Sequence, residues 1–460
     1  MLLVLIAIYK TMKKFITYTL FAVIVLTSCS KFLDEKPDKK MAVPKTLEHA
    51  NLLLNDYTTL NTVYPTFGEI AADDYFVSTD SWNALSDQDE KEVYLWSDQS
   101  IIGITQWQNP YKAIYQANQV LEILNKMEDI SDPVKFRQLE SEACFFRAFA
   151  LHQLAVVFAP PFRSMTATQD LGLPIRLSPD LDYPSSRSTL FETYHQIIQD
   201  YKNAITGLRN TKPPLGRPSK AAAYAGIART YLDIADYSNA FKYADSALQL
   251  NNFLINFNDV PASSAMPFAR FNDEVLFPAS TFLAGPLGTF FSRVDSNLYL
   301  SYGSQDLRKE RFYQKSEDGH YSFKGSYDGS ESGIFVGITT SEIYLIRAEA
   351  AVRTNNIQHG LSDLNHLLKN RWATGTFSEI TESDPERLLK IVLNERRKEL
   401  VFRGRRWADL KRLNQEARFE KTLVRRIADK KYTLLPNSNP YAILIPKIVI
   451  DLTGIPQNIR

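Results

Sequence analysis

The sequence has very few cysteines, only Cys29 and Cys144 among 460 residues. So few thiols exclude a disulfide framework, so an exported chain of this length must be held by a large hydrophobic core. Net charge is also nearly absent, because 53 basic residues balance 52 acidic ones to a formal charge of +1. This balance argues against a nucleic-acid-binding protein, whose affinity comes from basic residues that displace counterions.

Catalytic and metal-binding motifs are also lacking. The six histidines form no HExxH motif and no pair at zinc spacing, and neither a GxxxxGK[ST] loop nor a GxSxG elbow occurs. Asp73 and Asp74 are adjacent carboxylates, but neighbouring side chains of a strand point to opposite faces, whereas glycosidases need two facing carboxylates. We interpret the pair as turn and capping residues. The sequence therefore predicts no enzyme, no cofactor and no metal.

Long apolar runs are rare, and the one near the N-terminus is short. About a dozen mostly apolar residues, 15–26, follow Lys13 and Lys14 and precede Thr27-Ser28-Cys29. A spanning helix needs ~20 apolar residues. A basic head, a short apolar core and small residues predict a secretory signal peptide over 1–28. A membrane anchor or a buried helix with an incidental cysteine is the alternative.

Residues 26–29, "LTSC", resemble the lipobox of bacterial lipoproteins. The resemblance implies cleavage before Cys29, lipidation of its thiol, and no disulfide in the mature chain. A signal peptide does not need residues 1–11, so we interpret Met12 as the true start. Residues 29–45 are charged and contain prolines, which is typical of a tether.

Residues 46–460 are predicted to form one domain. Apolar periodicity predicts a helical scaffold over about 46–250 and 341–415. Between 255 and 335, Pro, Gly, Ser and Asn become frequent, and Asp318-Gly319 and Asp328-Gly329 are hairpin-type turn pairs. We expect loops and short strands there, and an extended C-terminal segment over 430–460.

Two segments match the tetratricopeptide pattern of paired helices with small contact residues. In residues 224–248, aromatic and small residues recur in one helix, and Ala240 and Ala247 lie in the next. A partial second copy places Tyr344, Ala348 and Gly360 at equivalent offsets. The predicted fold is therefore mostly α, with helical pairs, loop-rich ligand-binding insertions and a few short β-hairpins.

Several stretches together resemble the SusD/RagB family of outer-membrane lipoproteins of Bacteroidetes. They occur in the family's order: "KFLDEKP", "YKAIYQANQVLE", "SEACFFRAFALHQLAVVFAPP", "GRPSKAAAYAGIARTYLDIADYSNAFKYADSAL", "EIYLIRAEAAVRTNN" and "LNERRKELVFRGRRWADLKRLN". The resemblance implies a scaffold of four tetratricopeptide-like helix pairs and no catalytic activity. It also implies a lipid anchor in the outer membrane, exposure at the cell surface and a SusC-like TonB-dependent transporter as partner.

The chain departs from the family pattern near its C-terminus. Where many members read "FEGHRWFDL", it reads "VFRGRRWADL", with Arg403 for a glutamate and Ala408 for an aromatic residue. We predict one helix over 384–413, with Glu399–Arg403 and Arg405–Asp409 pairing on its surface. Its many basic residues are interpreted as a solvated, ion-paired face.

Binding residues concentrate on loops held by a rigid scaffold. We therefore expect ligand contacts at roughly 73–83 and within 285–330. Trp82 lies in a polar stretch and suits a stacking platform for a sugar ring, although an aromatic pinned onto the scaffold explains it equally well. The candidate ligand-binding residues are Asp73, Tyr75, Trp82, Asn83, Tyr299 and Tyr302.

The most favoured function is capture of an oligosaccharide for import by the partner transporter. Peptide capture in the manner of RagB is the nearest alternative. A tetratricopeptide scaffold that binds only protein partners is a second alternative, from a different class. Nucleic acid is excluded as a partner by export and by the charge balance.

Overall fold

The computed structural model describes residues 45–460, except 63, 212, 283 and 331–332. The chain divides into the units Met1–Lys45 and Thr46–Arg460, and the elements below belong to the second. The predicted signal peptide, the lipidation residue Cys29 and nearly all of the predicted tether lie outside the described residues. Helices dominate, and the strands are short and pair antiparallel, which confirms the predicted fold class.

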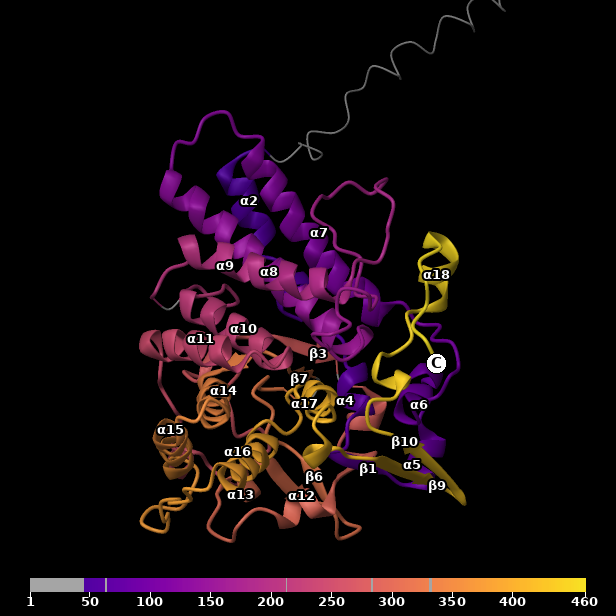
Figure 1. Cartoon of the computed structure of the whole chain (residues 1–460), viewed down its shortest axis with the longest axis vertical. Coiled ribbons are helices and arrows are strands. Elements are labelled where there is room, and N and C mark those ends of the chain that lie inside the picture. Colours follow the sequence, from indigo (N-terminus) through magenta and orange to yellow (C-terminus); the bar gives the residue numbers. More distant parts are fainter. Residues whose placement is uncertain (1–44, 63, 212, 283, 331–332) are drawn as a thin grey trace, which may run out of the picture. The chain divides into compact units, whose positions relative to one another are not determined.

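The scaffold is built from long helices packed on their chain neighbours (Figure 1). The helices of the first half are α2 (Leu47–Leu54), α3 (Tyr57–Asn61), α4 (Phe67–Ala71), α5 (Thr79–Ala84), α6 (Gln88–Tyr94), α7 (Thr105–Asn125), α8 (Pro133–Phe158), α9 (Leu190–Gly207), α10 (Lys220–Asp233) and α11 (Tyr237–Leu250). Those of the second half are α12 (Ser296–Leu300), α13 (Arg308–Phe312), α14 (Thr340–Arg353), α15 (Ile357–Lys369), α16 (Pro385–Glu399), α17 (Arg406–Leu413) and α18 (Lys447–Thr453).

Small residues let these helices approach closely, as the tetratricopeptide pattern predicts. α10 packs on α9 and α11, and α14 packs on α11 and α15. Ala240 and Ala247 of α11 are buried. Gly226 of α10 lies against Tyr201 of α9, where an added Cβ would come within 2.5 Å of the ring. At Gly360 of α15 an added Cβ would come within 2.6 Å of Val352.

The strands form five antiparallel pairs within the described residues, each made of two strands. Four of them lie in or next to the loop-rich region: β1 (Tyr75–Val77) with β4 (Ser292–Val294), β2 (Val275–Phe277) with β8 (Ile338–Thr339), β3 (Ser280–Phe282) with β7 (Gly333–Phe335), and β5 (Tyr313–Lys315) with β6 (Tyr321–Phe323). The fifth joins β9 (Leu423–Ile427) and β10 (Lys430–Leu434). Gly319, at φ +85°, closes the predicted β5–β6 hairpin. Gly329 lies between β6 and β7, each of which pairs with another strand among the described residues.

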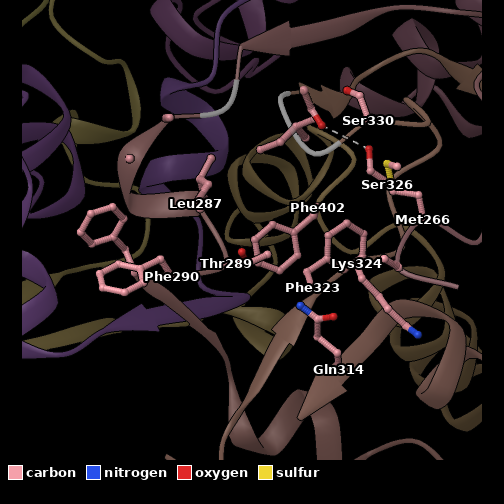
Figure 2. A pocket seen from close by; sticks show the side chains of 17 residues that line it. Met266, Leu287, Thr289, Phe290, Gln314, Phe323, Lys324, Ser326, Ser330 and Phe402 are labelled. Atoms are coloured by element: carbon pink, nitrogen blue, oxygen red, sulfur yellow. Dashed lines mark hydrogen bonds between the residues drawn. The ribbon is translucent and has the colours of Figure 1, made fainter. Parts of the chain in front are cut away.

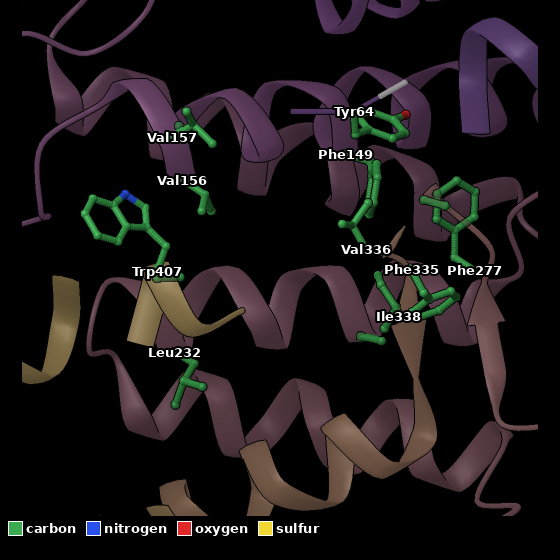
Figure 3. Packing of buried hydrophobic residues seen from close by; sticks show 14 of the residues in the cluster. Tyr64, Phe149, Val156, Val157, Leu232, Phe277, Phe335, Val336, Ile338 and Trp407 are labelled. Carbon is green, nitrogen blue, oxygen red and sulfur yellow. The ribbon is translucent and has the colours of Figure 1, made fainter. Parts of the chain in front are cut away.

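The hydrophobic core is continuous between the scaffold and the strand pairs (Figure 3). α8 is buried on nearly all sides from Leu139 to Phe158 because other elements surround it. The ring of Phe149 contacts Tyr64 at 4.9 Å and Phe277 of β2 at 4.8 Å between centroids. The loop-rich region is therefore packed onto α8, the longest helix among the described residues.

The predicted helix over 384–413 is wrong, because two helices, α16 and α17, occupy this range. Phe402 at φ +53° and Gly404 at φ +67° adopt the left-handed conformation, which no right-handed helix can include. The Gly404 N–H donates to Glu69 Oε2 at 2.8 Å, so the break is fixed to α4.

The predicted surface ion pairs of this segment are also wrong. Glu399 pairs with Arg371 at 2.9 Å, and Arg405 pairs with Asp233 at 2.5 Å. All four residues are buried. Arg403 is buried as well, with its guanidinium carbon 3.7 Å from the centroid of the Tyr327 ring. The basic segment thus forms an internal ionic network and not a solvated face.

The C-terminal segment 430–460 differs from the predicted extended chain. It contains β10, the 3₁₀ helix η5 (Asn439–Tyr441) and α18. Gly454, at φ +68°, ends α18 in the left-handed conformation that glycine adopts without strain. Further 3₁₀ turns are η2 (Phe257–Asp259), η3 (Gly285–Leu287) and η4 (Ala417–Phe419).

Candidate functional site

Asp73 forms ion pairs with residues that follow α16. Its carboxylate pairs with Arg406 and with Lys421, each at 2.6 Å. Burial raises the pKa of Asp73, but Arg406 and Arg397 outweigh burial and hold the pKa well below its usual range. Asp74 is buried and accepts from Arg397 Nε at 2.7 Å. The turn-and-capping interpretation of this pair is therefore wrong.

Tyr75 and Tyr302 lie inside the protein. The Tyr75 hydroxyl donates to the Ile70 carbonyl at 2.8 Å, and the ring is buried. Tyr302 is 2% exposed, and its hydroxyl lies 2.8 Å from both the Tyr313 hydroxyl and the Lys398 carbonyl. Neither ring offers a face to a sugar, which contradicts their prediction as ligand-binding residues.

Tyr299 is half-buried and covered on its ring. It stacks on Tyr321, with centroids 3.6 Å apart, and Lys309 Nζ lies 4.7 Å from its centroid. Burial and the Tyr321 hydroxyl raise the pKa of Tyr299. Tyr299 therefore packs against Tyr321 of the β5–β6 hairpin rather than presenting a free ring.

Trp82 and Asn83 lie in the short helix α5 and not in an irregular loop. Ser78 caps this helix by accepting the Ser81 N–H at 3.1 Å. Trp82 is half-buried, and Lys91 Nζ lies 4.7 Å from its ring. Its indole Nε1 is buried without an acceptor among the described residues. Asn83 is exposed.

A cleft of about 370 Å³ opens in the loop-rich region, and we name it the aromatic cleft. Figure 2 shows Phe323 and Phe402 side by side at its centre, stacked with centroids 4.7 Å apart. Phe290 is 76% exposed and lies edge-on to Phe291. The lining residues are Ala265, Met266, Ala284, Gly285, Leu287, Gly288, Thr289, Phe290, Phe291, Gln314, Phe323, Lys324, Ser326, Ser330, Gly333, Ile334 and Phe402.

Polar groups surround the stacked rings of the aromatic cleft. The Gln314 amide lies below the stacked rings in Figure 2, and Thr289 is exposed on the loop before Phe290. Lys324 Nζ donates to the carbonyls of Ala262 at 2.6 Å and Ser264 at 3.1 Å. Burial, helped by Arg311, lowers the pKa of Lys324. The cleft thus combines apolar ring faces with amide, hydroxyl and amine groups.

The walls of the cleft are held by elements far apart in sequence. In η3, the Gly285 N–H donates to Glu90 Oε2 of α6 at 2.9 Å. An added Cβ at Gly285 would lie 3.0 Å from Leu85, which follows α5. The β1–β4 pair joins the chain before α5 to the chain after Phe290. The structure therefore brings the two predicted loop regions together.

The β5–β6 hairpin contacts the β1–β4 strand pair. Phe76 of β1 lies edge-on to His320, with centroids 5.3 Å apart, and Arg293 of β4 pairs with Asp318 at 2.6 Å.

Sequence reasoning missed the phenylalanines of the cleft. The signal for Phe290 was present in "GPLGTFF", where two aromatics follow glycines without helical periodicity. Phe402 carried no such signal, because it is buried and its stacking on Phe323 depends on the break before α17.

Two further observations concern the described residues. Among residues 45–460, apart from the gaps named above, no group of three or more His, Cys, Asp or Glu side chains could hold a metal ion. In the same residues, no helix combines the length and the apolar character needed to cross a bilayer.

Comparisons with known proteins agree on one family. Residues 31–232 match a family described as starch-binding and associating with the outer membrane, and residues 270–439 match the SusD family. "SusD-like protein P2" of Formosa agariphila is 24% identical over 373 residues, which cover 67% of this chain and 71% of that protein.

Solved structures share the fold. A SusD superfamily protein of Bacteroides thetaiotaomicron matches with a TM-score of 0.71 and 23% identity, over 90% of this chain and 100% of that one. The surface glycan-binding protein A of Bacteroides uniformis matches with a TM-score of 0.68 and 18% identity, over 90% of this chain and 99% of that one.

Proposed function

The chain belongs to the SusD/RagB family, and from this premise we propose that it binds a neutral oligosaccharide in the aromatic cleft. The observation that carries the proposal is the exposed ring of Phe290 in the lining of the same cleft as the half-buried ring of Phe323, which stacks on the buried Phe402. Sugar rings present apolar C–H faces that pack on such rings. A cleft of about 370 Å³ is within the usual size of small-molecule sites.

The charges around the cleft favour an uncharged ligand. Arg293 is already paired with Asp318, and Lys324 already donates to two carbonyls. Gln314 and Thr289 remain as neutral groups that can exchange hydrogen bonds with sugar hydroxyls. A charged ligand would have to compete with these existing contacts.

The proposed role includes anchoring and delivery. Cys29 carries the lipid that holds the protein at the outer membrane, and a SusC-like TonB-dependent transporter receives the ligand. The family match to proteins associating with the outer membrane supports this role. When the native protein is purified in mild detergent, a β-barrel of the TonB-dependent class is expected to co-purify with it. Recovery of the lipoprotein alone, from cells that express both, would contradict the partnership.

The binding site is tested with Phe290→Ala and the control Phe253→Ala. Phe253 is also exposed, at 47%, but it does not line the cleft. Loss of a stacked ring costs on the order of 1–3 kcal/mol, so Phe290→Ala should weaken binding about ten- to hundredfold while Phe253→Ala leaves it unchanged. Calorimetry with neutral hexasaccharides of glucose, xylose and mannose measures the affinity.

The same assay separates the alternatives. Peptides from a casein digest serve as the second class of probe. Binding of peptides but not of sugars, with the same sensitivity to Phe290→Ala, would establish the site and replace the ligand class. An unchanged affinity in Phe290→Ala would remove the aromatic cleft from the proposal.

A further inference from the structure

Residues 174–188 form a surface loop between α8 and α9 that is fixed at both ends, and we name it the strap. Its base is closed because the Gly172 N–H donates to the Ser188 carbonyl at 2.8 Å and the Ser188 N–H donates to the Leu173 carbonyl at 3.1 Å. The Tyr111 hydroxyl of α7 donates to the Pro174 carbonyl at 2.9 Å. The strap is therefore anchored to the scaffold.

One arginine holds the interior of the strap in shape. Arg176 donates to the Tyr183 carbonyl at 2.7 Å, to Ser185 Oγ at 3.1 Å and to the Asp180 carbonyl. Its guanidinium carbon lies 5.4 Å from the centroid of the Tyr183 ring. That ring is nevertheless 61% exposed. An exposed aromatic side chain is thus placed at the surface by a preorganised loop.

A second aromatic surface lies across from the strap on the first turns of α9. Phe191 is 48% exposed and stacks with His195, with centroids 5.9 Å apart and planes 22° apart. Between the strap and α9 lies a cleft of about 470 Å³, which we name the strap cleft. Ser185, Ser186 and Gln196 line it together with Tyr183, Phe191 and His195.

The charged groups of the strap cleft already have partners within the protein. Arg187 donates to the carbonyls of Gly172 at 2.7 Å and Pro456 at 3.0 Å, and Glu192 accepts from the Thr189 N–H and hydroxyl. Gln196 Nε2 donates to Asp200 at 2.9 Å and Ser185 Oγ accepts from Arg176, but the Gln196 oxygen and the hydroxyl hydrogens of Ser185 and Ser186 lie in a cleft with exposed rings and have no further partner among the described residues. This is the chemistry that a pyranose ring requires, with an apolar face to stack and hydroxyls to bond.

We propose that the strap cleft is a second saccharide site, independent of the aromatic cleft. The two clefts share no lining residue and are built by different elements. The ligand class is a neutral pyranose unit, so the proposal rests on the proposed carbohydrate-binding function. With a second site, one protein can hold two segments of the same glycan. The avidity for long chains then exceeds the affinity of either site alone.

The test uses the full mature chain and a Phe290→Ala background, in which the aromatic cleft is weakened. Binding of the neutral hexasaccharides is measured in Phe290→Ala, Phe191→Ala and the double variant. We expect Phe290→Ala to retain weak binding and the added Phe191→Ala to weaken that remainder about tenfold or more. Phe253→Ala, combined with Phe290→Ala, is the matched control and should leave the remainder unchanged.

A direct measurement does not depend on any substitution. Tetranitromethane nitrates exposed tyrosines, and peptide mass spectrometry reads the extent at Tyr183. Saturating hexasaccharide is expected to reduce nitration of Tyr183 at least severalfold in the wild type and in Phe290→Ala alike. Unchanged nitration of Tyr183 under saturating probe overturns the second site.

The outcomes separate the two proposals. If Phe290→Ala abolishes all binding and Phe191→Ala changes none, the aromatic cleft stands and the strap cleft falls. If Phe191→Ala weakens binding and Phe290→Ala has no effect, the strap cleft stands and the aromatic cleft falls. If none of the probes binds the wild type, both proposals fail.

Discussion

For a single aromatic residue, what covers the ring decides whether it binds a ligand or supports the fold. Trp82 is half-buried and packs against the core, and Lys91 Nζ lies over its ring. Its ring is therefore less accessible to a ligand than an exposed one, and it contributes to the stability of the fold. We expect Trp82→Ala to lower the free energy of unfolding by about 1–3 kcal/mol, through lost apolar burial. Trp82→Phe should recover most of it, because a ring remains. Urea denaturation measures both, and an unchanged midpoint for Trp82→Ala would contradict the packing role.

Glu69 makes stability depend on pH. Burial, reinforced by Asp74, raises its pKa from 4.5 to about 8, although Arg406 opposes the shift. An unfolded chain releases this proton near its ordinary pKa, whereas the folded protein keeps it until about pH 8. The folded state therefore binds more protons between these values, and the stability contributed by Glu69 is lost as the pH rises through this window.

Glu69→Gln tests this dependence. The amide oxygen can still accept the Gly404 N–H, but the side chain no longer ionises. We expect the melting temperature of the variant, relative to the wild type, to rise by a few degrees between about pH 5 and about pH 8. Thermal unfolding in a buffer series measures the difference. A difference that is constant across the series would show that Glu69 does not titrate in this range.

At the scale of helices, close packing at two glycines predicts a graded response. Alanine improves helix propensity by about 1 kcal/mol at either position. At Gly226 the new methyl meets three atoms of the rigid Tyr201 ring within 3.0 Å, whereas at Gly360 only one atom, a methyl of Val352, lies that close and the Ala348 carbonyl oxygen lies at 3.1 Å. Gly226→Ala should therefore lose about 1–3 kcal/mol, and Gly360→Ala should lose less. Equal losses in urea denaturation would contradict this account.

Helices of this protein could be predicted from the sequence wherever local signals agree. The offsets of Tyr224, Ala228 and Ala240 reflect a contact between chain neighbours, so periodicity reveals it. The break between α16 and α17 could not be predicted, because it depends on the contact of Gly404 with Glu69, over 300 residues away. The local i,i+4 spacing predicts surface ion pairs for Glu399 and Arg405, but in the folded protein these residues pair with distant Arg371 and Asp233 instead.

The candidate site shows the same limit. The two loop regions meet because β1 pairs with β4, and the sequence gives no local sign of pairing between strands so far apart. Tyrosines predicted to bind ligand fill the core under the loops, as Tyr302 does. Phe290 and Phe323 line the aromatic cleft only through the arrangement of η3 and β6, and the turn before α17 places the buried Phe402 against Phe323. Residue type and loop position predict the region, and tertiary burial selects the residues.

For the molecule as a whole, buried ion pairs join segments far apart in sequence. Asp233 of α10 accepts from Arg405 at 2.5 Å and contacts His152 of α8 at 2.8 Å. Arg412 of α17 pairs with Glu349 of α14. Such pairs are costly to break from one side, because a buried charge then remains without its partner. The Asp233–Arg405 pair fixes the first half of the scaffold to the second, and the other two pairs hold helices together within each half.

The proposed attachment to the membrane depends on Cys29. Residues 26–29 resemble a lipobox, and a double acyl modification would hold a protein stably at a bilayer, at ~0.8 kcal/mol per buried methylene. We expect Cys29→Ala either to block maturation or to release the protein from the membrane fraction. Cys144→Ala is the matched control, because that thiol is buried in α8 and should leave localisation unchanged. Fractionation and metabolic labelling with palmitate measure both. Cys29→Ala that remains anchored and labelled would contradict the lipoprotein assignment, whereas released protein that still binds sugar would show that capture needs only the folded domain.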